Sequence, residues 1–336
     1  MQKYFIIGLF AYASITFSAN AQGVFMNPWE ERAIGEQGHP KAIERDGGEY
    51  PDRELARYIR SVASAAAYSS ARNPDQFVIT TLNNPSFNAY ARPGGFLYVH
   101  AGILPWMNDE AELMALLGHE VGHAINRHSA RQYNRESVAS RIIERAQQRR
   151  RGREDPMLEQ RKMEAWMALS QYGRDQEFES DDVSLQVLIR TDRDPAASTR
   201  MLSRLLQYQQ IMDKLVGSSD ETPDHSSSHP PGIDRVRRAA SQMNQAGVTT
   251  IPEQRYRTRY LDAINGLVVP ASPLYLNRPF RVQIYTVRAG DTVASLASRM
   301  QTYPLVQEDM FRAVNGLTST DTLAEGMVVK IFTGIT

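Results

Sequence analysis

The feature that most constrains this chain is a pair of histidines four residues apart, His119 and His123, in the stretch LLGHEVGH. The surrounding apolar residues predict a helix over residues 110–130. Residues four apart lie on one face of a helix, so both imidazoles can face one ion. Glu120 can then reach the open side of that ion without binding it. The pattern H-E-x-x-H predicts a hydrolase site in which the two histidines bind zinc and Glu120 takes a proton from water.

A second pair of residues four apart supplies the missing ligand. Glu177 and Asp181 lie on a helix predicted from about residue 174 to 190. Catalytic zinc takes three protein ligands and keeps a fourth position for water, and two histidines with one glutamate form such a set. We expect Glu177 to bind the ion and Asp181 to accept the N–H of one ligating histidine, although the spacing does not say which. The neighbouring Glu179 and Asp182 are interpreted as a solvated acidic face.

An ordinary surface helix with scattered histidines is the alternative, because H-E-x-x-H also occurs by chance. Gly118 and Gly122 lie inside the motif, and each glycine costs a helix ~1 kcal/mol relative to alanine. Their presence indicates that backbone or substrate approaches closely there. His128 lies five residues past His123 and so off its helical face, which favours a supporting or structural role over metal binding.

Charge and cysteine content narrow the class of partner and of metal site. Lys+Arg and Asp+Glu are both 38, so the formal net charge is zero and nothing favours nucleic acid as a partner. The sequence has no cysteine, so any metal must be held by histidines and carboxylates. A hydrophobic fraction of 42% and a length of 336 residues fit one large or two modest globular domains.

The first 21 residues have the pattern of a secretory signal peptide. Lys3 is followed by an apolar run from Tyr4 to Phe17 and then by the cleavage pattern Ala19-Asn20-Ala21. A membrane anchor is the alternative, but the run is shorter than a ~20-residue span and is interrupted by Ser and Thr. We therefore expect an exported mature chain without a transmembrane segment.

Periodicity and turn signals divide the remaining chain. Helices are predicted at residues 53–72, 201–215 and 233–245, and strands at 77–82 and 96–104. A Ser/Pro-rich loop covers residues 217–232.

Several motifs in one order carry a family resemblance. These are NNPSFNAYARPGGFLYVHAGIL, the H-E-x-x-H helix, GRDQEFESDD and HPPGIDRVRR. Residues 50 to 245 thereby resemble the HtpX- and BepA-type zinc metallopeptidases, relatives of the CAAX prenyl proteases. The resemblance implies one Zn²⁺ held by the three ligands named above. It also implies that His229 lies near the zinc and regulates access, and that Arg235 stabilises charge on the substrate carbonyl. The signal peptide resembles the soluble periplasmic branch.

The last segment, from YTVRAGDTV to MVVKIF, reads strand, helix, helix, strand. It resembles the LysM fold, a βααβ module that binds N-acetylglucosamine polymers, and so implies peptidoglycan as a partner. A packing module is the alternative. The expected fold is α+β: a mainly helical zincin-type domain with a small sheet, plus the LysM-like module. The expected division is a signal peptide (1–21), a peptidase domain (22–250), a connector (251–283) and the module (284–333).

Substrate recognition is expected at the strand GGFLYVHAG. We predict that Phe96, Leu97, Tyr98 and Val99 pair with an extended peptide by strand addition. The expected function is a zinc endopeptidase of the bacterial cell envelope that cleaves misfolded or misassembled exported proteins. The alternative is a weakly proteolytic chaperone or scaffold, latched by the 217–232 loop and anchored to peptidoglycan.

Overall fold

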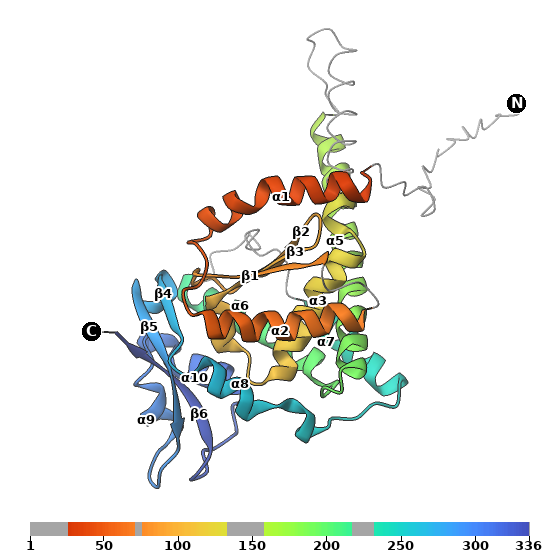
Figure 1. The fold of residues 1–336 in the computed structure, drawn as a ribbon. Helices are drawn as coiled ribbons and strands as arrows, with labels where there is room; N and C mark the ends of the chain where they lie inside the picture. The colour runs from red at the N-terminus through yellow and green to blue at the C-terminus, as the bar shows by residue number, and fades with distance from the viewer. Residues whose placement is uncertain (1–25, 71–75, 133–157, 217–231, 336) are drawn as a thin grey trace, which may run out of the picture.

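The computed structural model describes residues 26–70, 76–132, 158–216 and 232–335 (Figure 1). It is an α+β fold, mainly helical, with two small sheets and a small C-terminal module, which confirms the predicted class. Within the described ranges, no helix combines the length and the apolar character needed to cross a membrane. The predicted signal peptide lies outside the described residues.

The first sheet has three strands in the order β1-β3-β2, with β3 parallel to β1 and antiparallel to β2. Its strands and covering helices are α1 (Pro28–Arg45), α2 (Arg53–Ser69), β1 (Val78–Leu82), β2 (Ala89–Arg92) and β3 (Phe96–His100). Because side chains alternate along a strand, Phe96 and Tyr98 pack beside α1, whereas Leu97 and Val99 join the main core with α2. The sheet therefore lies between α1 and α2 (Figure 1).

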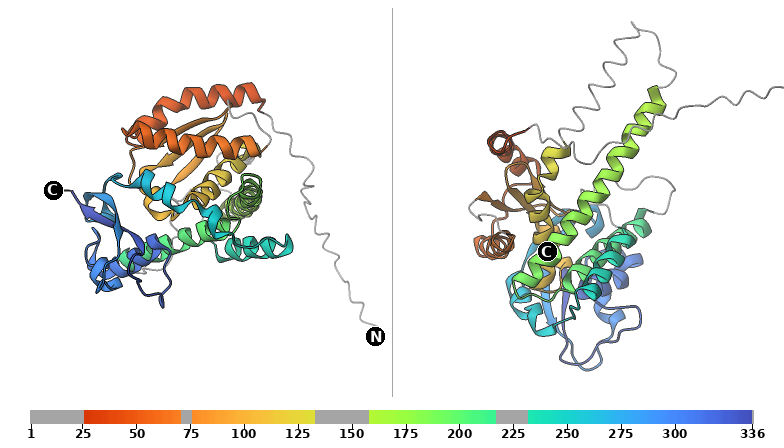
Figure 2. Two further views of the ribbon diagram at one scale, coloured as in Figure 1. Left: turned by 60° about the horizontal axis from the view of Figure 1, so that its bottom comes forward. Right: turned by 90° about the vertical axis from the view of Figure 1, so that its right-hand side faces the viewer.

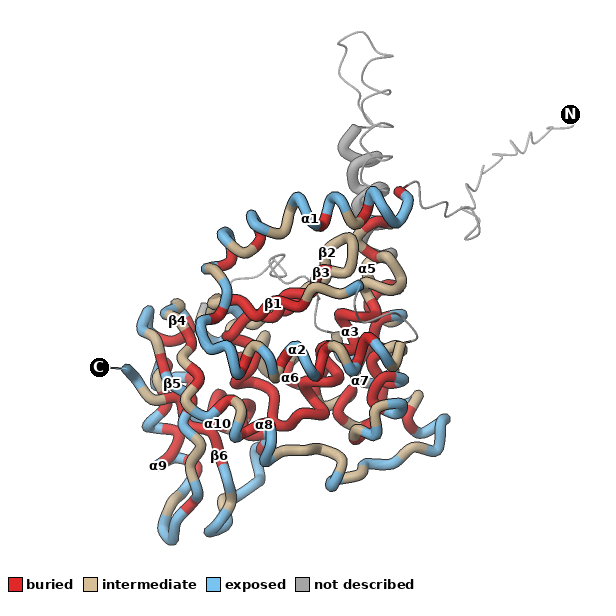
Figure 3. Tube along the Cα trace, viewed as in Figure 1, coloured by how far each residue is buried: buried red, intermediate tan, exposed pale blue. Residues whose placement is uncertain are grey.

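Helix α3 (Glu110–Ile125) carries the H-E-x-x-H motif at the centre of the molecule. All its residues from Glu110 to Gly122 are buried (Figure 3). Three helices lie around it: α5 (Leu158–Arg190), α6 (Ala197–Val216) and α7 (Ile233–Gln245). The 3-10 helix η2 (Ala101–Trp106) leads from β3 toward α3. α5 runs through the molecule alongside α3 (Figure 2).

Buried charges fix the N-terminal end of α3. Asp109 caps the helix and, with Glu110 and Glu112, has no more than 1% of its side chain exposed. Arg200 binds Asp109 and Glu112, and Arg193 binds Glu110 at 2.6 Å. Each buried carboxylate thus has a cation, as a buried charge requires.

Helix α3 ends earlier than the sequence predicts. The predicted helix extends to residue 130, but α3 ends at Ile125 and Arg127 adopts a left-handed conformation with φ of 55°. A short helical stretch begins again at His128. The chain therefore changes direction between His123 and His128.

The C-terminal part forms a second sheet in the antiparallel order β4-β5-β6. Its elements are η3 (Pro252–Arg255), α8 (Arg257–Ile264), β4 (Val268–Ser272), η4 (Pro273–Tyr275), β5 (Arg278–Thr286), α9 (Val293–Ala297), η5 (Pro304–Val306), α10 (Gln307–Asn315) and β6 (Val328–Gly334). β5, α9, α10 and β6 reproduce the predicted strand–helix–helix–strand order. The predicted connector, residues 251–283, adds α8 and a third strand to this sheet.

The C-terminal sheet is docked on the segment that leads into α3. Lys330 of β6 is fully buried, and its Nζ donates to the carbonyls of Pro105 at 2.8 Å and Met107 at 2.5 Å. Arg257 donates to the carbonyls of Asn108 and Val328. One continuous apolar core runs from α2 and α3 into β5 and β6.

Candidate functional site

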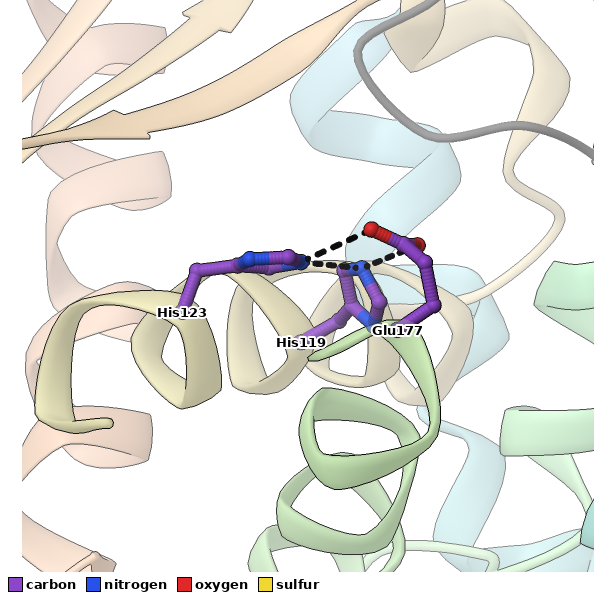
Figure 4. A group of neighbouring side chains, drawn as sticks. All are labelled: His119, His123 and Glu177. Atoms are coloured by element: carbon purple, nitrogen blue, oxygen red, sulfur yellow. Dashed lines mark hydrogen bonds and ion pairs between the residues drawn. The ribbon is translucent and has the colours of Figure 1, made fainter. Parts of the chain in front are cut away.

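Three predicted ligands converge in one buried cluster (Figure 4). The Nε2 atoms of His119 and His123 are 3.1 Å apart, and the Glu177 carboxylate lies 3.4 Å from the first and 3.3 Å from the second. With metal bonds of about 2.0–2.1 Å, tetrahedral geometry places ligand atoms about 3.3 Å apart. The three side chains are at most 11% exposed. Their donor atoms and spacing therefore fit a zinc ion.

Close packing of α3 on α5 brings these ligands together. A Cβ placed on Gly122 would lie 2.9 Å from Ser180 Cα, and one placed on Gly118 would lie 3.2 Å from Ser184 Cα. Ser184 Oγ also donates to the carbonyl of Ala115 across the same seam, at 2.7 Å. The prediction of a close backbone approach at the two glycines is confirmed. At this close approach α5 presents Glu177 to the two histidines.

Asp181 and Arg235 surround the ligand cluster. Asp181 Oδ1 lies 2.9 Å from His119 Nδ1, so Asp181 orients His119, which the spacing alone could not decide. Arg235, at the start of α7, donates Nε and Nη2 to Asp181 and places Nη1 2.8 Å from Glu177. Burial raises the pKa of Asp181, but hydrogen bonds from Arg235 and His119 outweigh it and lower the pKa to about 2. Asp181 is therefore a carboxylate at neutral pH.

Glu120 lies in a pocket beside the ligand cluster. Its side chain is fully buried, and His119 and Arg235 line the same pocket. The other lining residues come from β2 and the two residues before it, and from η2, α3 and α6. Most are apolar: Phe87, Asn88, Ala89, Ile103, Leu116, Met201 and Leu205. The arrangement places a carboxylate, a guanidinium and an imidazole in one pocket whose remaining lining is mostly apolar. The predicted roles of Glu120 as base and of Arg235 at the substrate carbonyl stay predictions.

His128 is a neighbour of the cluster but not a member of it. Its Nδ1 lies 3.0 Å from His123 Nδ1 and its Nε2 lies 2.8 Å from Glu179 Oε2. Glu179 also accepts from Arg131 at 3.2 Å, and Asp182 pairs with Arg238. Glu179 and Asp182 keep 49% and 35% of their side chains exposed, which fits the predicted solvated acidic face, and each also carries an ion pair.

The strand predicted to pair with substrate cannot do so. Phe96, Leu97, Tyr98 and Val99 belong to β3, which is bonded to β1 along one edge and to β2 along the other. A central strand has no edge left for a peptide. β2 forms the edge of this sheet on the side of α3, since β2 packs against α3 more closely than β3 does.

The predicted gating residue, His229, lies outside the described residues. The same holds for residues 217–231 of the predicted latch loop. Their roles stay predictions.

Taken together, an H-E-x-x-H helix joined by a glutamate from a second helix defines a metallopeptidase-type site. Residues 50–243 match the profile of peptidase family M48, and the chain belongs to that family. Residues 285–332 match the LysM domain.

Among curated proteins, the chain is similar to the beta-barrel assembly-enhancing protease of Yersinia pestis, at 26% identity over 58% of this chain and 40% of the relative. The Escherichia coli (strain K12) protein of the same name is 24% identical over the same shares. The mitochondrial metalloendopeptidase OMA1 of Schizosaccharomyces pombe is 26% identical over 60% of this chain and 58% of the relative. The chain thus matches between 40% and 58% of the length of these relatives.

Proposed function

We propose that the chain is a zinc-dependent endopeptidase that cleaves misfolded or misassembled exported proteins in the bacterial cell envelope. The observation that carries the proposal is the buried His119–His123–Glu177 cluster with Glu120 in the adjoining pocket. A zinc ion held by those three residues supplies a Lewis acid that lowers the pKa of water and polarises a carbonyl.

The chain's own residues do the remaining work. Glu120 takes a proton from the attacking water on its carboxylate and gives it to the departing amine nitrogen. Asp181 holds the ring of His119 through Nδ1, and Arg235 pairs with both Asp181 and Glu177. Because Arg235 also lines the pocket, its guanidinium is placed to attract the oxygen of a substrate carbonyl.

Further observations support the proposed substrate and location. Bacterial relatives are named for enhancing β-barrel assembly, and residues 285–332 match a domain type that binds N-acetylglucosamine polymers such as peptidoglycan. The signal-peptide pattern of residues 1–21 agrees with export to the periplasm. The edge strand β2 replaces β3 as the proposed pairing strand for an extended substrate.

The test compares the full chain with its Glu120→Gln variant. Zinc content is measured by metal analysis, and cleavage is measured with casein as the unfolded substrate. The variant should keep its zinc and lose cleavage by about 10²–10⁴-fold, the usual contribution of a positioned acid–base group. Asp182 lies on α5 and pairs with Arg238 rather than with the ligand cluster. Asp182→Asn should therefore leave zinc content and cleavage unchanged. Equal cleavage by wild type and Glu120→Gln would contradict Glu120 as the proton acceptor, whereas zinc-bound wild type without measurable cleavage would favour the weakly proteolytic chaperone. Co-sedimentation of the full chain with purified peptidoglycan tests the anchor, and absence of binding would reject it.

A further inference from the structure

We propose that His128 is a positioning residue for the metal centre: it accepts the Nδ1 proton of His123 and is itself held by Glu179. The inference rests on metal binding by His123, which is part of the proposed function. It assigns a task to a histidine that the H-E-x-x-H pattern does not include.

The contacts fix the direction of the hydrogen bonds in the series from His123 through His128 to Glu179. His123 turns Nε2 toward His119 and Glu177, so a metal bound there uses the Nε2 lone pair. A neutral imidazole that ligates through one nitrogen carries its proton on the other. His123 Nδ1 is therefore a donor, and its neighbour at 3.0 Å, His128 Nδ1, must accept.

The direction of the bond from His128 to Glu179 follows from that of the bond between the two histidines. Because His128 accepts at Nδ1, its proton resides on Nε2, and that atom lies 2.8 Å from Glu179. A carboxylate only accepts, so this bond also runs in the required direction. Arg131 Nη1 lies 3.2 Å from the same Glu179 oxygen and also donates to it. The series His123, His128, Glu179 therefore has a consistent donor and acceptor at each step.

The backbone turn after α3 places His128 beside His123. Along a continuous helix a residue five positions on would lie off the face of His123, but the left-handed Arg127 interrupts the helix before His128. Arg127 is itself held from α1, with Nε 2.6 Å from Glu31 and Nη2 donating to the carbonyl of Met26. His128 ends up 2% exposed, with its ring edge-on to that of His123.

Helix α5 thereby supports both metal-binding histidines. Asp181 contacts His119 directly, whereas Glu179, two residues earlier, reaches His123 through the ring of His128. Groups that hold the outer nitrogen of a ligating histidine fix its tautomer and ring orientation, and their loss typically weakens metal affinity by 10–100-fold.

The test measures zinc affinity by competition with a chelating dye. His128→Ala removes the acceptor and should weaken zinc binding by about 10–100-fold. His128→Asn places an oxygen near the position of Nδ1. Because this oxygen can accept from His123, the variant should recover most of the lost zinc affinity, although it cannot reach Glu179. Glu179→Ala should weaken binding less than His128→Ala, and Asp182→Ala, on the same helix but paired with Arg238, should leave it unchanged.

Two further readouts separate positioning from packing. The absorption spectrum of the cobalt-substituted protein should change in His128→Ala and return toward wild type in His128→Asn. Thermal unfolding of the metal-free variants measures folding by itself. Unchanged zinc affinity in His128→Ala, or a loss that His128→Asn does not recover, would overturn the proposal. A wild-type chain that binds no zinc would instead overturn the proposed function.

Discussion

Replacing Gly122 by alanine should separate α3 from α5 and damage the metal centre. The added Cβ would lie 2.9 Å from Ser180 Cα, a backbone atom that cannot rotate away. Overpacking of this kind costs about 1–3 kcal/mol, and the better helix propensity of alanine returns about 1 kcal/mol. The net loss in the free energy of unfolding is therefore up to about 2 kcal/mol. With an unfolding entropy of ~2.1 cal/mol/K per residue, a chain of 336 residues should lose up to about 3 °C in Tm.

The same substitution should weaken zinc binding. Ser180 is three residues past Glu177 on α5, so a shift that relieves Ser180 also moves the Glu177 carboxylate away from the two histidines. Differential scanning calorimetry of the metal-free protein and zinc titration of the same preparation measure the two effects separately.

Two other helical glycines provide matched controls. A Cβ on Gly118 would lie 3.2 Å from Ser184 Cα, so Gly118→Ala should cost less than Gly122→Ala. A Cβ on Gly173 of α5 meets no atom within 4 Å, so Gly173→Ala should stabilise the chain by about 1 kcal/mol. If Gly122→Ala proved as stable as Gly173→Ala and bound zinc equally well, the reasoning from close helix packing would be refuted.

Two further predictions concern buried charges. Lys330→Met keeps the apolar stem but leaves the carbonyls of Pro105 and Met107 without their donor, at about 1–3 kcal/mol each, partly offset because no polar amino group stays buried. The free energy of unfolding of the full-length variant, measured by thermal unfolding, should fall by about 2 kcal/mol. An unchanged Tm would contradict the role of Lys330 in docking the C-terminal sheet. Burial raises the pKa of Asp46, but hydrogen bonds from Arg45 and Tyr90 outweigh it and lower the pKa from 3.8 to about 2. A lowered pKa means that this stabilisation is present above about pH 4 and lost as the pH falls to 2. The stability difference between wild type and Asp46→Asn should therefore shrink over that range, and a constant difference would argue against the ion pair.

The metal ligands could be predicted because a helix encodes its faces in residue spacing. His119 with His123, and Glu177 with Asp181, are each four apart, and both stretches are helical, although α3 ends at Ile125 rather than at residue 130 and α5 begins at Leu158 rather than at about 174. What the spacing could not supply was the rotation of α5 about α3. That rotation, set at the two glycines, directs Asp181 to His119 rather than to His123.

Strand order was not readable from the strand itself. The sequence predicts a strand at Phe96–Val99 but does not state its neighbours. One signal pointed to the interior of a sheet, since four consecutive apolar residues are typical of a strand buried on both faces. Every residue of β3 is indeed buried.

The position of His128 depends on a single backbone conformation. Non-glycine residues seldom adopt positive φ, so nothing in the sequence predicts the turn at Arg127. The helix that holds this turn, α1, went unpredicted although its start has a clear signal. Asn27 and Glu30 form a capping box around Pro28 at the first helical position.

The bond between Lys330 and Pro105 also has a consequence in time. The two residues are 225 positions apart in a chain that is synthesised from its N-terminus. At 5–20 residues per second, about 10–45 s pass between the appearance of one and of the other. During that interval the segment before α3 lacks the donor that satisfies its carbonyls, and contacts of such long range form slowly. The helix that carries the candidate metal site should therefore reach its fully packed state only once the C-terminal module is present, and a chain interrupted before Lys330 should not reach it.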